Sequence, residues 1–181
     1  MKLGCFTTVG KSGHTVILAF VLLDSESVVA LHWAFRCFAK HFKRHPATIF
    51  TDEGATILIA VASMQDEAWK GTVHMLCTYH IAKNFYKHVH PAVRDTGEWH
   101  SVNSAFWKLA KYSDTQFDPQ PLWDWILETV KKDARPSSGA AVIWLESLWV
   151  KRDHWLACLT WKHCSWGIHS TQRAESIHAA I

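Results

Sequence analysis

The sequence predicts an α/β fold in its first half and a helical second half. Three observations support this prediction. Two β-like runs flank a turn near the start, strand-like runs and helical spacing then alternate up to about residue 94, and beyond it the apolar residues recur at helical spacing. The chain of 181 residues is 49% hydrophobic and 19% charged, which excludes a disordered protein. Its longest apolar run, Val16 to Leu23, is too short to cross a bilayer, so we expect no membrane partner.

The first elements are a predicted hairpin and a helix. Gly4–Val9 and Thr15–Leu23 are rich in residues that favour strands, and residues 10–13 (Gly-Lys-Ser-Gly) between them predict a turn. Ser25 or Ser27 is the expected cap of the helix that follows. Steps of three and four residues place on one face of this helix Val28, Leu31, Phe35, Phe38 and Phe42.

Four more elements complete the predicted α/β part. The β-branched content of Ala47–Thr51 predicts a buried strand that ends at Asp52, and a short helix is expected over Gly54–Met64. Thr72–Cys77 is the next strand and His80–Val93 the next helix. The order β-β-α-β-α-β-α is typical of a layered sheet covered by helices.

The second half predicts helices rich in tryptophan. A polar joint containing Pro136 is expected at residues 131–139 and a last helix from Ser170. Since most of the eleven tryptophans recur at helical spacing, we expect most of them in the core. The other expected helices are one through Val102, Phe106 and Leu109, one through Trp123, Leu127 and Val130, one over Ala140–Val150, and one over Arg152–Trp161.

Asp52 fits two roles. It follows a predicted buried strand, and ligand and metal groups gather at the carboxyl ends of strands in open α/β sheets. A carboxylate at that position can bind a hard cation such as Mg²⁺. It can equally cap the helix that opens at Gly54, and the segment alone favours the cap.

Cys77 and His80 also leave two interpretations open. A cysteine and a histidine three residues apart can bind one metal ion, but a structural zinc site needs four ligands. The other candidate ligands are His163, Cys164 and His169. Because no spacing brings these groups together, a buried thiol beside a partly buried imidazole is favoured over zinc.

Glu175 lies at the start of the last predicted helix. Helical spacing places it on one face with Thr171 and His178. A carboxylate there could join Asp52 at a metal centre, or it could complement the helix dipole, and the dipole role is favoured from this segment alone.

Three segments, taken together, resemble the transposase domain of Mutator-like elements, the MULE transposase domain. They are Ala-Thr-Ile-Phe-Thr-Asp52, then Cys77-Thr-Tyr-His80-Ile-Ala-Lys-Asn-Phe85, then Ser170-Thr-Gln-Arg-Ala-Glu175-Ser. The chain is similar also to the domesticated far-red-impaired-response proteins of plants. The resemblance covers about residues 2–178, and the order and spacing of the segments carry it.

The resemblance implies an RNase H-like fold with an all-helical insertion before its last catalytic helix. It divides the chain into a core over residues 1–94, the insertion over 95–166, and the last helix over 167–181. It also implies a DDE triad that holds two divalent cations, normally Mg²⁺, for DNA strand cleavage and transfer. Asp52 matches the second carboxylate and Glu175 the third, and Cys77 and His80 match a motif close to the active site.

The first Asp of this triad has no counterpart in the chain. In the family it lies on a strand that would precede Gly4, and Asp24 stands in the wrong place to replace it. That strand is central, since it pairs with both the hairpin and the strand ending at Asp52. We therefore expect a fragment of a cut-and-paste transposase that is inactive, or nearly so, as this chain alone.

The alternative function is a domesticated, non-catalytic protein that binds DNA and regulates transcription. Lys40, Lys43 and Arg44 on one predicted helix, and Lys83 and Lys87 on another, favour DNA contact. In either case the expected partners are transposon ends and target DNA. A nuclear location and a homo-oligomer are expectations of the same kind.

Overall fold

The computed structural model describes residues 1–93, 95–132, 135–163 and 165. The chain forms two compact units, each described here by itself. Among the described residues, the first spans Met1–Cys77 and is called the α/β unit, and the second begins at Thr78 and is called the helical unit. The part of the chain that the structure describes contains no helix long and apolar enough to cross a membrane.

The α/β unit contains two separate two-stranded sheets. In the first, β1 (Lys2–Val9) pairs antiparallel with β2 (Thr15–Leu23) across the predicted turn. In the second, β3 (Thr48–Thr51) pairs parallel with β4 (Val73–Leu76), with Thr48 opposite Val73. The α/β class and the predicted order of elements are therefore confirmed.

Helix α1 (Val28–Phe42) begins where the sequence predicts. The hydroxyl of Ser27 accepts the Ala30 N–H at 3.2 Å, so Ser27 is the cap rather than Ser25. The helix ends at Lys43, whose φ of 52° is left-handed and stops the helical path.

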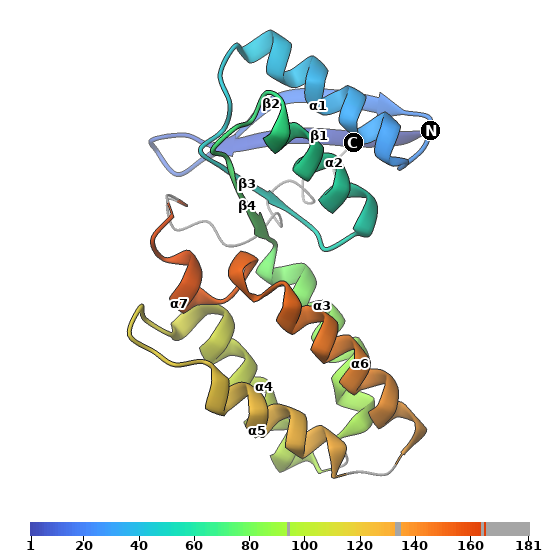
Figure 1. Ribbon diagram of the computed structural model, residues 1–181, viewed down its shortest axis with the longest axis vertical. Coiled ribbons are helices and arrows are strands. Elements are labelled where there is room, and N and C mark those ends of the chain that lie inside the picture. The colour runs from blue at the N-terminus through green and yellow to red at the C-terminus, as the bar shows by residue number, and fades with distance from the viewer. Residues whose placement is uncertain (94, 133–134, 164, 166–181) are drawn as a thin grey trace. The chain divides into compact units, whose positions relative to one another are not determined.

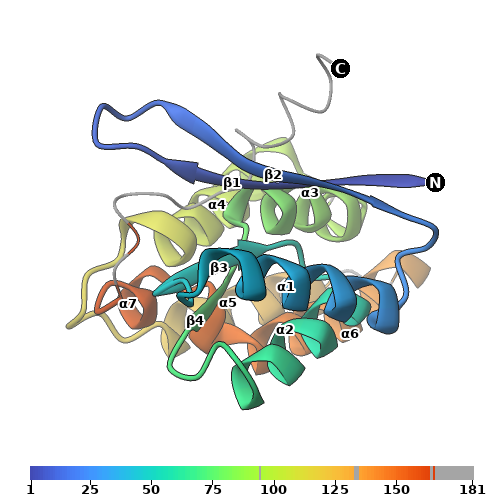
Figure 2. The same cartoon turned by 90° about the horizontal axis from the view of Figure 1, so that it is seen from above.

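Helices α1 and α2 (Ala55–Asp66) supply most of the core of the α/β unit. Phe6 of β1 stacks on Phe38 of α1, with ring centroids 4.4 Å apart. Figure 1 shows the two helices side by side, and Figure 2 shows both on the same side of the β1–β2 hairpin. The buried cluster consists of Phe35, Ala60, Val61, Met64 and Trp69.

The helical unit is built from paired helices. In Figure 1, α3 lies beside α6, and α4 beside α5. Stacked rings pack the helices together. The ring centroids of Phe85 and Phe106 lie 4.3 Å apart, and those of Trp123 and Trp149 lie 4.8 Å apart. The elements are α3 (Thr78–Val89), the 3₁₀ turn η1 (His90–Ala92), α4 (Thr96–Trp107), the π-helical segment η2 (Lys108–Tyr112), α5 (Gln120–Lys131), α6 (Pro136–Val150), the 3₁₀ turn η3 (Arg152–His154) and α7 (Ala157–Thr160).

Two predicted boundaries in the second half are wrong. Helix α6 begins at Pro136, inside the expected polar joint, because proline fits the first turn of a helix, where its missing N–H has no intrahelical partner. A continuous helix over Arg152–Trp161 does not form either. The chain turns at Trp155, whose buried ring donates to the Leu148 carbonyl at 3.2 Å, and only α7 is helical beyond that turn.

The prediction that most tryptophans lie in the core holds for only some of them. Of the ten tryptophans that the structure describes, three are buried, namely Trp69, Trp123 and Trp155, and four others are half-buried. By contrast, the exposed ones are Trp33, Trp125 and Trp161.

Candidate active site

Two neighbouring parallel strands place Asp52 and Cys77 at the same edge of a sheet. Thr51 is the last residue of β3 and stands opposite Leu76, the last residue of β4. The next residue of each strand is Asp52 or Cys77, and the Cys77 N–H donates to the Thr51 carbonyl at 2.7 Å. The carboxyl ends of parallel strands are where α/β proteins place their ligand groups.

The Asp52 carboxylate is exposed, and a turn that it forms with the backbone orients it. Its Oδ1 accepts the Gly54 N–H at 3.0 Å. Gly54 is the cap residue of α2 and has no side chain to satisfy the first turn. Asp52 thus shapes the entry to α2 without being the cap itself. A carboxylate has several acceptor positions, so this bond is compatible with a cation on the same group.

Thr51, the residue before Asp52, forms a buried polar pair with His74. The Thr51 hydroxyl donates to the Asp52 carbonyl oxygen at 2.7 Å, and it lies 2.8 Å from Nε2 of His74 on β4. Because the hydroxyl has a single proton, we infer that it accepts from His74 Nε2–H. This pair ties β3 to β4 one residue before Asp52.

Sequence reasoning missed this Thr51–His74 pair. The signal was a lone histidine within an apolar strand, and its partner becomes visible only once the β3–β4 register is known.

Cys77 and His80 lie on consecutive elements. The Cys77 thiol is fully buried after β4, and His80 is half-buried in the first turn of α3. No group of three or more His, Cys, Asp or Glu side chains that could hold a metal is found among the residues that the structure describes. Of the further zinc candidates, Cys164 and His169 lie outside that set, so the zinc hypothesis stays a hypothesis.

Glu175 also lies outside the described residues, as does the whole segment from Ser170 that carried part of the resemblance. The described part of the predicted site is therefore Asp52 with its supports: the Gly54 N–H, the Thr51–His74 pair and the neighbouring Cys77.

The carboxyl end of a parallel strand, where Asp52 lies, is a position at which α/β proteins bind their ligands. Residues 1–84, less than half of the chain, match the family model of the MULE transposase domain. The match contains Asp52, Cys77 and His80 and ends at Asn84, within α3. No curated protein and no solved structure matches the chain.

Proposed function

We propose that residues 1–84 belong to the RNase H-like core of a DDE transposase and that Asp52 is one of its metal-binding carboxylates. The observation that carries the proposal is the position of Asp52, immediately after β3 and beside the end of β4, within the segment that matches the transposase family. The family implies DNA as the partner. A nuclear location is part of the same proposal.

The sheet arrangement supports an RNase H-like core. Among the described residues, β1 pairs with β2 and β3 pairs with β4, and no described strand joins the two sheets. The family resemblance places one strand between the hairpin and the strand that ends at Asp52. Two separate sheets are the arrangement expected of a core described without that strand.

The Asp52 carboxylate itself suits a hard cation such as Mg²⁺. Asp52 offers carboxylate oxygens, which are the ligands that hard cations prefer, and it is exposed to solvent. When bound, such cations activate the attacking oxygen and stabilise the leaving oxygen of a phosphodiester. Asp52 would hold the ion together with Glu175. The Gly54 N–H fixes its carboxylate, and the Thr51–His74 pair and the Cys77 N–H fix its backbone.

The test is a titration of the full chain with Mg²⁺ and Mn²⁺ by calorimetry. Asp52→Asn should weaken metal binding at least tenfold, since it removes the ligand charge. Asp24→Asn is the matched control because Asp24 is also exposed, lies in the α/β unit, and is not a proposed ligand. Equal losses in both variants, or no binding at millimolar metal, would reject the metal site.

A cleavage assay separates the catalytic function from its alternative. Metal-dependent nicking of plasmid DNA that disappears in Asp52→Asn would show that this chain is itself a nuclease. The alternative is a non-catalytic DNA-binding regulator, favoured by the cations Lys40, Lys43 and Arg44 near the end of α1. It predicts salt-dependent DNA binding without nicking, and the same binding in Asp52→Asn.

A further inference from the structure

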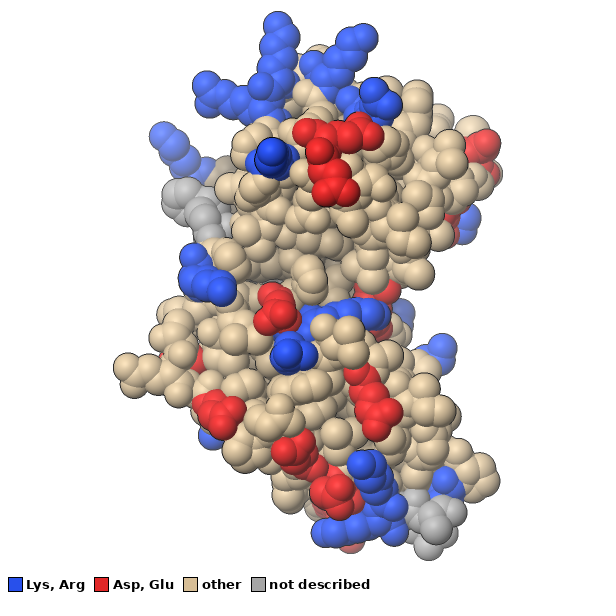
Figure 3. All heavy atoms as spheres, in the orientation of Figure 1, with Lys and Arg blue, Asp and Glu red and all other residues tan. Residues whose placement is uncertain are grey.

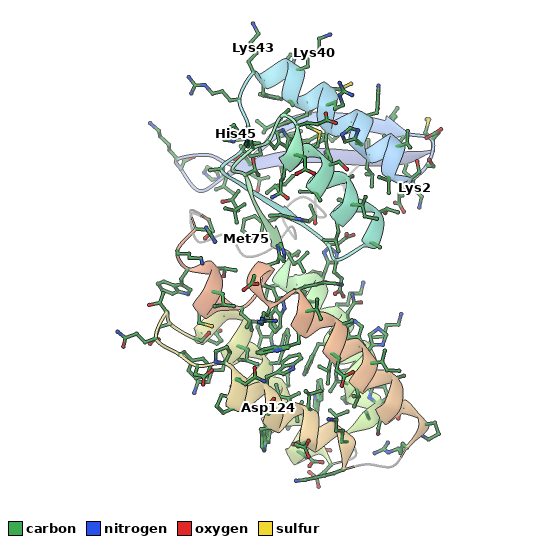
Figure 4. All side chains as sticks on the ribbon, viewed as in Figure 1. Lys2, Lys40, Lys43, His45, Met75 and Asp124 are labelled. Atoms are coloured by element: carbon green, nitrogen blue, oxygen red, sulfur yellow. The ribbon has the colours of Figure 1, made fainter. Side chains whose placement is uncertain are left out.

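A hollow of about 780 Å³ runs along the outer side of α1 and is lined by four cationic side chains. Its other lining residues include Glu67 and Ala68, which follow α2. Figure 3 shows Lys and Arg gathered at the top of the view, where Figure 4 labels Lys40 and Lys43. We call this hollow the α1 groove, and its four cations are Arg36, Lys40, Lys43 and Arg44.

The segment that supplies the cations of the α1 groove carries no acidic residue. The chain contains no Asp or Glu between Glu26 and Asp52. The acidic side chain in the lining is Glu67, and it is already engaged. Its carboxylate lies 3.7 Å from Arg36 Nε and 3.4 Å from His32 Nε2.

The remaining three cations, Lys40, Lys43 and Arg44, have no carboxylate within ion-pair distance among the described residues. Three unpaired cations in one groove fit a polyanion better than a single small anion.

An exposed aromatic ring continues the cation row. Trp33 lines the same groove and is 55% exposed, although burial of a tryptophan is strongly favourable. The steps from Trp33 to Arg36 and Lys40 are three and four residues, so the indole and these two cations share one face of α1, and Lys43 follows at the C-terminal end of the helix.

Cations beside an exposed aromatic ring are the combination used to hold unpaired nucleic-acid strands. The cations follow the phosphates, and a base stacks on the ring. In a duplex the faces of the bases are covered by their neighbours, so an exposed indole gains nothing from them.

We propose that the α1 groove binds a single strand of DNA, with phosphates on Lys40, Lys43 and Arg44 and one base stacked on Trp33. This inference rests on the proposed function only in that DNA is the partner. It adds a binding surface separate from Asp52, which is not among the residues that line the groove. Such a surface would hold the strand that unpairs at a cleavage site.

The main test is the binding of a fluorescent 20-nucleotide oligothymidylate to the full chain, measured by anisotropy in EDTA over a range of salt. Lys40→Ala/Lys43→Ala should weaken binding roughly tenfold at low salt and lower the slope of log K against log salt by about 1.4, because two phosphate contacts are lost. The matched control is Lys131→Ala/Lys132→Ala, which removes two exposed lysines at the end of α5 and should change neither quantity.

Trp33 tests the stacking contact separately from charge. Trp33→Ala should weaken binding roughly tenfold without changing the salt slope, and Trp33→Phe should restore most of the affinity because every base can stack on an aromatic ring. The control is Trp161→Ala, which removes another exposed indole from the helical unit. All of these positions are exposed, so circular dichroism should show that each variant folds.

The exposed thiol of Cys37, which lines the groove, gives a readout that needs no variant. Bound oligothymidylate should slow its alkylation by iodoacetamide at least several-fold, as read from its peptide by mass spectrometry.

Three results would overturn the inference: equal losses in the α5 control, tighter binding of a 20-base-pair duplex than of the single strand, or unchanged affinity in Trp33→Ala. None of them touches the metal-binding test of Asp52, because the anisotropy is measured without metal. If the unaltered chain binds neither single-stranded nor duplex DNA at low salt, the DNA partner of the proposed function fails as well.

Discussion

The two units of the chain hold their elements together in different ways. The helical unit is packed by large rings such as Phe85, Phe106 and Trp123, all of them buried between helices. The α/β unit has two-stranded sheets, and its hairpin leaves Phe20 48% and Leu22 60% exposed. A two-stranded hairpin is at best marginally stable by itself, so this unit depends on the packing of α1 and α2 against it.

The candidate binding sites and the buried rings of the helical unit lie in different units of the chain. The candidate metal ligand Asp52 and the α1 groove both lie in the α/β unit, on the surface of a small core. The helical unit contributes none of the described groups of the proposed metal site. Substitutions of the buried rings in the helical unit should therefore lower stability strongly, and those that alter binding most should fall in the α/β unit.

The largest expected effect on stability is that of Trp123→Ala in α5. The Trp123 ring is 1% exposed and stacks on Trp149, so its removal leaves a large cavity and should cost about 3–5 kcal/mol in the free energy of unfolding. Urea denaturation followed by circular dichroism measures the loss, and hydrogen exchange should show it in the amides of α5 and α6.

Trp125→Ala on the same helix is the matched control. The Trp125 ring is 41% exposed, so its removal should cost within about 0.5 kcal/mol. If the two variants were equally stable, the helical unit would not depend on its stacked rings, and the contrast between the units would be lost.

A smaller effect is expected from Thr51→Val in the α/β unit. Valine keeps the shape of threonine but leaves Nε2–H of the buried His74 without its hydroxyl partner, which should cost about 1–3 kcal/mol. Thr8→Val removes an exposed hydroxyl from β1 and should be close to neutral. A neutral Thr51→Val would mean that the hydroxyl does not tie β3 to β4.

The sequence predicted the α/β unit more completely than the helical unit, for a physical reason. In the first unit the signals are local and agree: Thr15–Leu23 is a strand with the predicted bounds, because a β-branched run follows a glycine turn. In the second unit apolar residues occur on every side of α6, so periodicity could not fix where that helix begins.

The candidate site was likewise predicted in part, where the signals are local. The sequence located Asp52 and Cys77 because each follows a short apolar run, and the parallel pairing of β3 and β4 then brings them to one edge. The Thr51–His74 bond could not be predicted, since it depends on strand register, which no local pattern contains.

The α1 groove could be predicted only in part. Its cations share a helix face in the sequence, but its far wall comes from residues after α2.

A loss of about 1 kcal/mol is expected from Ser27→Ala, because the Ser27 hydroxyl satisfies the Ala30 N–H at the start of α1. The effect should appear as a lower urea midpoint of the α/β unit. Ser101→Ala on α4 is a suitable comparison, since the Ser101 hydroxyl donates only to the Gly97 carbonyl within its own helix and alanine is a better helix former. An equal loss in both variants would argue against a specific role for the cap.

The smallest expected effect on stability, about 0.5 kcal/mol, is that of Gly54→Ala, because alanine is a poorer cap residue than glycine. The added Cβ would lie 3.1 Å from Asp52 Oδ1, so the carboxylate must shift by a few tenths of an ångström. Metal binding should therefore weaken severalfold, while Gly139→Ala in α6, where the new methyl meets no atom within 4 Å, should leave it unchanged. Calorimetric titration with Mn²⁺ compares the two, and an unchanged affinity in Gly54→Ala would show that the turn at Asp52 serves α2 rather than a metal ion.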